Sequence, residues 1–188
     1  VPAWLSSGLG QVYETFEERS GGKAALIGRP DSGMVAFLKG GTPMPLARLT
    51  GIRWDDPDLV PGGLQRSRFD AHAWALVHYL SFGPRRSQFA KYMASLHAGT
   101  ADGQAFAEAF GDTRALESEL SDYIRKFLFP ALQVVFDEKV TPSLPPRGEV
   151  LTEADAEAFL SGLVMRLGDT TQARGRLQKA LAATPSSA

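Results

Sequence analysis

The spacing of apolar residues along the chain predicts a mostly helical fold. Between Leu116 and Phe127 these residues recur with the period of one helix face, and Asp112 precedes them as a candidate N-cap. A broader apolar surface over 69–80 predicts a second helix, buried on most sides, that ends at Gly83-Pro84. Further helices are expected over 4–16, 89–96 and 105–110.

Signals for β structure are sparse. Ala24–Ile27 is the one strand-like run, and its shortness predicts no more than a small hairpin or an edge strand. The Gly- and Pro-rich segment 40–64 is expected to be loop with one short helix around 46–49. The glycines inside the first expected helix, Gly8 and Gly10, would permit close contact with another helix. The expected fold class is therefore mainly α, with at most a small β element.

Three prolines and a glycine between 140 and 150 interrupt the helical pattern. We interpret this segment as a Pro-rich linker between a helical domain, 1–139, and a C-terminal unit, 151–188. In that unit Thr152 and Asp155 have the spacing of a capping box, and Gly168-Asp169 separates two amphipathic segments. The expectation is a hairpin of two antiparallel helices.

Composition narrows the classes of function. The 188 residues carry 20 Lys and Arg against 21 Asp and Glu, with no cysteine. This excludes a disulfide scaffold or a cysteine-ligated zinc module, and without a basic face we expect no nucleic-acid partner. No apolar run is long enough for a membrane span. The chain starts at Val1 without an apolar signal core, so we expect a processed product or a fragment. The oligomeric state is left open.

Several polar residues are candidates for a cleft. Ser7, Gln11 and Glu14 share one helix face, which would either line a cleft or face solvent. His72 and His78 are six residues apart, so their rings would diverge by about 120° and could not clamp a metal from one straight helix. His72 would point into a groove or be an ordinary hydrogen-bonded histidine. His78 is expected in the core with one ring nitrogen bonded to the backbone.

The C-terminal unit resembles a single tetratricopeptide repeat. Ser161 stands where the repeat usually has glycine. One such hairpin cannot bury its apolar face alone. The alternative is a plain amphipathic hairpin. The residues that carry the resemblance are Leu160, Gly168-Asp169, Ala173, Leu177, Ala180-Leu181 and Pro185.

The segments Pro2 to Gln11, Phe16-Glu17, Ile27 to Pro30 and Phe69 to Leu80 resemble the downstream half of bacterial gluzincin-type "peptidase MA-like" domains of unassigned function. That family binds zinc through an H-E-x-x-H helix and a glutamate from a following P-x-W-L-x-E-G-L-A-E helix.

The resemblance does not extend to the residues that bind zinc in that family. Ser7 stands at the expected glutamate, Gln11 replaces a second acidic residue, and Asp70 stands where the family often has tyrosine. The sequence contains no H-E-x-x-H motif. We therefore expect no catalytic residue, no metal and no cofactor, and we expect that this chain is not an enzyme.

Together these patterns predict a non-catalytic remnant or fragment of a zinc-metallopeptidase-like protein that binds a peptide or protein partner. An apolar groove near Trp4, Trp54 or Trp74 is its expected place. Two alternatives stay open. The chain would be part of an active metallopeptidase whose H-E-x-x-H helix lies upstream, with Glu14 or Asp70 completing the zinc site, or a purely structural helical module. The compartment is open, with a periplasmic or otherwise exported location preferred. The candidate vestigial cleft comprises Ser7, Gln11, Glu14, Asp70, His72 and Trp74.

Overall fold

The computed structural model describes residues 1–140, 148 and 150–183, and its chain divides into two compact units, 1–141 and 142–188. The division falls within the Pro-rich segment 140–150, most of which lies outside the described residues, as does Pro185. Each unit is described by itself.

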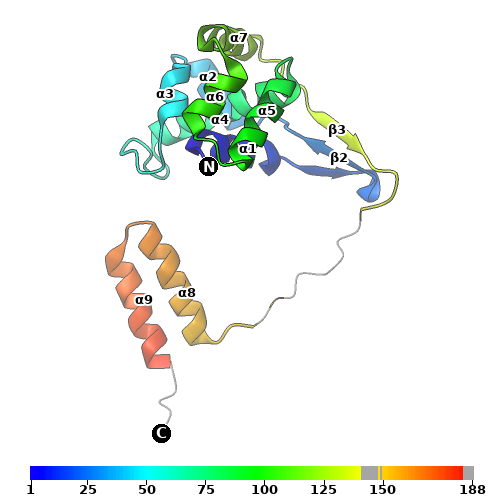
Figure 1. The fold of residues 1–188 in the computed structure, drawn as a ribbon. Coiled ribbons are helices and arrows are strands. Elements are labelled where there is room, and N and C mark those ends of the chain that lie inside the picture. Colours follow the sequence, from blue (N-terminus) through cyan, green and yellow to red (C-terminus); the bar gives the residue numbers. More distant parts are fainter. Residues whose placement is uncertain (141–147, 149, 184–188) are drawn as a thin grey trace. The chain divides into compact units, whose positions relative to one another are not determined.

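Helices make up most of the first unit, which confirms the mainly α fold class (Figure 1). The five helices expected there are present, and the short helix expected around 46–49 is α3. A further helix, α2, was not predicted. The helices of this unit are α1 (Ala3–Glu14), α2 (Ser32–Gly40), α3 (Leu46–Gly51), α4 (Leu64–Phe82), α5 (Arg86–His97), α6 (Asp102–Phe110) and α7 (Thr113–Lys126).

The core is built around α4. Every residue from 71 to 80 is buried, so this helix is enclosed on all sides, as its broad apolar surface predicts. Helix α1 packs along it at Gly8. A Cβ atom at that position would lie 2.4 Å from the carbonyl oxygen of Ala73 and 2.4 Å from Cγ2 of Val77. The expected close helix contact is thus confirmed at Gly8, whereas nothing lies within 4 Å of a Cβ atom at Gly10.

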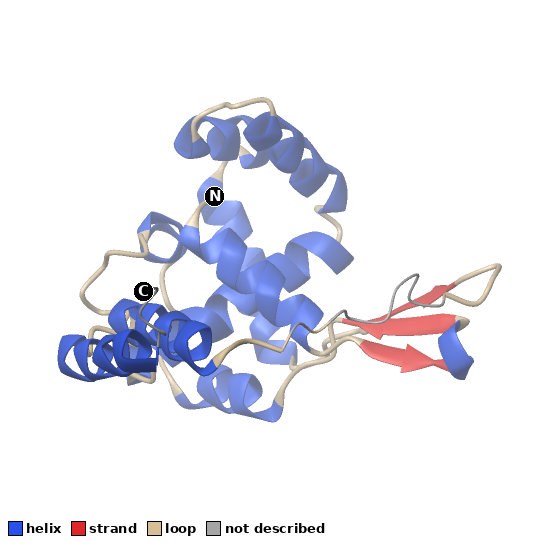
Figure 2. Ribbon diagram, turned by 90° about the horizontal axis from the view of Figure 1, so that it is seen from below, coloured by secondary structure: helices blue, strands red, loops and turns tan. Residues whose placement is uncertain are grey.

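Three short antiparallel strands form one sheet, β1 (Glu17–Arg19), β2 (Ala24–Ile27) and β3 (Leu132–Val135), in the order β1-β2-β3. A 3-10 turn, η1 (Ser20–Gly22), joins the first two strands. Of the two alternatives expected for 24–27, the small hairpin is present as the antiparallel pair of β1 and β2. The edge strand was wrong, because β3 pairs with the other side of β2 and places it in the centre. Figure 2 shows the strands extending away from the helices of this unit.

His78 connects the sheet to the helices. Its ring is fully buried, and Nε2 lies 2.8 Å from the carbonyl oxygen of Gly28, just after β2. The expected bond between one ring nitrogen and the backbone is confirmed. The other nitrogen, Nδ1, lies 2.6 Å from the hydroxyl of Tyr123 on α7. One side chain therefore joins α4 to both the sheet and α7.

The second unit is a hairpin of α8 (Glu153–Arg166) and α9 (Thr170–Ala183). Thr152 caps α8 by accepting a bond from the backbone N–H of Asp155, as the capping-box spacing predicts. The helices meet through small buried residues, and the hydroxyl of Ser161 donates to the carbonyl oxygen of Ala173 at 2.9 Å. The resemblance to a tetratricopeptide repeat stays a prediction. One stripe of α8 remains exposed and apolar, namely Phe159, Leu160 and Leu163, and Leu167 continues it just after the helix.

Candidate functional site

Ser7 and Asp70 meet between α1 and α4. The Ser7 hydroxyl donates to Oδ1 of Asp70 at 2.6 Å. Nε of Arg66, one turn earlier on α4, lies 3.0 Å from Oδ1 and 2.8 Å from Oδ2 of the same carboxylate. The Asp70 side chain is only 19 % exposed. The Arg66 guanidinium thus balances its charge, and the Ser7 hydroxyl adds a hydrogen bond, as a partly buried carboxylate requires.

Arg66 carries this network outward to Trp54. Its guanidinium carbon lies 5.0 Å from the centre of the Trp54 ring, within the range of a cation–π contact. The Trp54 ring also meets Phe69 edge-on at 6.4 Å. Trp54 is itself half exposed. A continuous series of polar and aromatic contacts therefore runs from the core to the surface. Its members, in order, are Ser7, Asp70, Arg66 and Trp54.

The other four residues of the predicted cleft do not join this network. Ser7 is buried, Gln11 is half-buried and Glu14 is exposed. The polar face of α1 therefore becomes more exposed towards the C-terminal end of the helix. His72 donates from Nδ1 to the carbonyl oxygen of Arg68 at 2.8 Å, and burial lowers its pKa, which keeps the ring neutral. Trp74 is fully buried against Phe129, with ring centres 4.9 Å apart.

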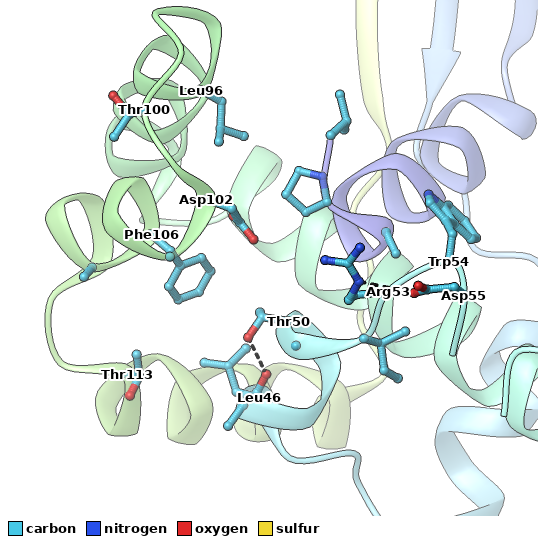
Figure 3. Close-up of a pocket in the computed structure, with 18 of the residues that line it drawn as sticks. Leu46, Thr50, Arg53, Trp54, Asp55, Leu96, Thr100, Asp102, Phe106 and Thr113 are labelled. Carbon is cyan, nitrogen blue, oxygen red and sulfur yellow. Dashed lines mark hydrogen bonds and ion pairs between the residues drawn. The ribbon is translucent and has the colours of Figure 1, made fainter. Parts of the chain in front are cut away.

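A cavity of about 1170 Å³ lies on the other side of Trp54 (Figure 3). It is open to solvent and is lined by the N-terminal end of α1, by α3 and residues 52–55 after it, by residues 96–100, by α6 and by the start of α7. None of the six residues of the predicted cleft lines this cavity, and none lines three smaller pockets of the described chain. Of the three tryptophans, Trp54 lines the cavity, whereas Trp4 and Trp74 are buried.

Apolar groups make up most of the cavity wall. Leu96, Ile52 and Phe106 contribute to it, and Figure 3 shows the Phe106 ring pointing into the space from α6. The Thr50 hydroxyl is already used, since it donates to the carbonyl oxygen of Leu46 at 3.0 Å. Sites for organic ligands typically combine such apolar walls with a few placed polar groups.

Two carboxylates are held in the wall. Oδ1 of Asp102, at the start of α6, accepts a hydrogen bond from the hydroxyl of buried Tyr92 at 2.6 Å, and burial raises the pKa of Tyr92 so that this hydroxyl keeps its proton. Oε1 of Glu117 on α7 accepts from the backbone N–H of Leu46 at 3.0 Å, which fixes the first turn of α3. Both acids are therefore positioned by neighbouring groups.

Sequence reasoning named Trp54 as one of three places for an apolar groove, but it missed the rest of the wall because that wall comes from five separate segments. Phe106 was recognised only as part of a helix, and Asp102 carried no motif. The contact between Tyr92 and Asp102 joins α5 to α6, and no spacing rule within one helix reports such a pair. An acid at the first position of a helix that follows an aromatic-rich helix is the sequence signal that points to Asp102.

The described residues contain no cluster of three or more His, Asp or Glu side chains placed to hold a metal ion. Within the same residues, no helix combines the length and apolarity needed to cross a membrane. No protein-family model, curated protein or solved structure matches this chain. Function is therefore inferred from the geometry of the site.

Proposed function

We propose that this chain is a non-catalytic binding module for a peptide or protein segment, derived from a zinc-metallopeptidase-like protein. The proposed binding site is the cavity beside Trp54, which is called the cleft from here on and is not the predicted cleft around Ser7. Its volume of about 1170 Å³ is the observation that carries the proposal. Pockets for small ligands are typically about 300–1,000 Å³. A cleft at or above that range, with mostly apolar walls, suits several side chains of a peptide.

The state of Asp70 supports a non-catalytic role. A carboxylate that ligates zinc must direct an oxygen at the metal, but both oxygens of Asp70 are engaged by Arg66, and Oδ1 also accepts from Ser7. Ser7 donates its proton to this carboxylate, and no histidine is hydrogen-bonded to it among the described residues, so it lacks the base that activates a serine nucleophile.

The proposal is tested by filling the cleft. Ala47 on α3 and Ala107 on α6 both line it and are exposed, so Ala47→Trp and Ala107→Trp would occupy the space without disturbing the core. Ala94→Trp on α5 adds the same side chain at an exposed position that does not line the cleft. The probe is a phage-displayed library of random dodecapeptides panned against the full chain.

We expect peptides enriched on the unmodified chain to lose binding to both cleft-filling variants and to keep binding to Ala94→Trp. Enrichment no greater than on the heat-unfolded chain would contradict the proposal. Binding that survives both cleft-filling substitutions would also contradict it, because the peptides would then occupy another surface.

A further inference from the structure

The charges around the cleft are unbalanced. Four charged side chains line it, namely Arg53, Asp55, Asp102 and Glu117. Arg53 and Asp55 pair with each other, with Nε 3.2 Å from Oδ1, and are both largely exposed. Neither Asp102 nor Glu117 has an ion-pair partner in the part of the chain that the structure describes. Val1 also lines the cleft, but it is 93 % exposed, so water screens its α-amino group.

Asp102 is the better placed of the two acids. Glu117 is committed to the backbone N–H of Leu46. The bond from Tyr92 occupies only Oδ1 of Asp102, and Oδ2 has no partner among the described residues. Figure 3 shows the Asp102 carboxylate directed into the cleft, beside Phe106.

The Tyr92 side chain, which holds Asp102, is fixed by its packing. The Tyr92 side chain is fully buried and stacks on Trp4, with ring centres 5.6 Å apart. The Tyr92 ring also meets Phe106 edge-on at 5.8 Å. A carboxylate held by a fixed hydroxyl loses little conformational freedom when a ligand binds, which favours affinity.

We propose that the cleft binds a Lys or Arg side chain of a peptide, with its cationic group on Asp102 and the flanking apolar residues against Phe106 and Leu96. This inference rests on the proposed function and adds the chemistry of its ligand. A cation is the complement of a cleft in which two of the three acids lack an ion-pair partner among the described residues. The residues that flank this Lys or Arg in the peptide should be apolar, because most of the cleft wall is apolar.

The experiment compares three blocked pentapeptides on the isotope-labelled full chain by NMR titration. They share the form Leu-Ala-X-Ala-Leu, with lysine, the uncharged isostere norleucine, or glutamate at X. We expect the lysine peptide to bind about tenfold more tightly than the norleucine peptide, with the glutamate peptide weakest. The largest shifts are expected at the amides of Gly103 and Ala107, which line the cleft.

Asp102→Asn is the decisive variant because an amide oxygen still accepts the bond from Tyr92 while the charge is removed. It should reduce the preference for lysine over norleucine to about one. Asp137→Asn removes the same charge at an exposed position outside the cleft and should leave the preference intact. If Asp102→Asn does not fold, raising the salt concentration on the unmodified chain should weaken binding of the lysine peptide and leave the norleucine peptide unaffected.

Equal affinity for the lysine and norleucine peptides would overturn the inference while leaving the proposed function in place. A lysine preference that persists in Asp102→Asn would overturn it as well. Failure of all three peptides to bind would also overturn the inference. If panning on the unmodified chain enriches no peptide either, the proposed function itself is overturned.

Discussion

Nε2 of His78 lies 2.8 Å from the carbonyl oxygen of Gly28, and this bond holds α4 against the end of β2. A carbonyl oxygen only accepts, so Nε2 carries the ring proton and Nδ1 accepts from the Tyr123 hydroxyl. Burial lowers the pKa of His78 to about 4. The ring is therefore neutral in the folded chain at pH 7, and both of its nitrogens are satisfied.

This arrangement makes the stability of the first unit depend on pH. An unfolded histidine takes up a proton near pH 6.5, whereas folded His78 does so only near pH 4. Between these values the unfolded state binds more protons, so the free energy of unfolding falls as the pH falls, by up to about 3 kcal/mol from this group. Burial lowers the pKa of His72 too, which adds to the same trend.

The measurement is urea unfolding followed by tryptophan fluorescence at pH 7 and pH 5. Trp4, Trp54 and Trp74 all lie in the first unit, so the signal reports that unit. His78→Gln should flatten the dependence on pH. A free energy of unfolding that stays constant between pH 7 and pH 5 in the unmodified chain would count against a buried neutral imidazole.

Gly8 and Gly10 provide a matched pair of substitutions on α1. Gly8→Ala places a methyl group 2.4 Å from the carbonyl oxygen of Ala73, which cannot yield without moving α4, so we expect a loss of about 1–3 kcal/mol. Nothing lies within 4 Å of a Cβ atom at Gly10, so Gly10→Ala should stabilise the helix by up to about 1 kcal/mol. Urea midpoints of both variants test this, and equal effects would show that the contact does not constrain α1.

Ser7 and Asp70 are expected to be energetically coupled. Ser7→Ala removes a hydrogen bond to a charged group and should lower the free energy of unfolding by about 1.5–3 kcal/mol. A double-mutant cycle of Ser7→Ala with Asp70→Asn measures the coupling, which should be at least about 0.5 kcal/mol. As the control, Ser87→Ala, on the exposed side of α5, should show no coupling to Asp70→Asn.

The same network predicts how the chain responds to zinc. Because Arg66 balances the charge of Asp70, we expect less than one equivalent of zinc after dialysis against the metal, with no change in Asp70→Asn or Glu14→Gln. Metal content is measured by atomic emission. One tightly held zinc per chain, lost in either variant, would instead support the alternative in which this chain completes the zinc site of a longer metallopeptidase.

Ser161 sets the distance between α8 and α9. It is buried, and its hydroxyl donates to the carbonyl oxygen of Ala173, so Ser161→Leu should force the helices apart. Amide hydrogen exchange in the full chain should accelerate over 153–183 and stay unchanged over α4. Gly162→Leu, at a neighbouring exposed position with nothing within 4 Å, is the control and should not accelerate exchange.

Helices with a strong apolar period were predictable from the sequence, as were the strand β2 and the short helix α3, whereas β3 and α2 were not. The stripe from Leu116 to Ile124 is buried in α7, and the Asp112 cap is present. Strand β3 was missed because Leu132–Val135 is only four residues long, and its stability comes from pairing with β2 about a hundred residues earlier. Helix α2 was missed because Gly33 and Gly40 obscure its short apolar pattern.

Prediction of the site succeeded only in part. Ser7 and Asp70 were singled out by resemblance and are in contact, although no local spacing connects α1 to α4. The resemblance itself remains a prediction. His72 and Trp74 were placed in the cleft, but their bonds and contacts are with their own helix and the core. Spacing fixes the face of a helix on which a residue lies, whereas the partner of that face is decided by packing.

The pairing of β2 with β3 limits where this chain can be cut. Leu132–Val135 is the last element of the first unit, yet it covers a strand formed by residues 24–27. A shortened protein that stops after α7 would keep every helix of this unit and expose the backbone amides and carbonyls of β2 along one side. Such an open edge recruits strands from other molecules. Expression of the helical part alone would therefore yield aggregates, and a soluble version needs to extend through Val135.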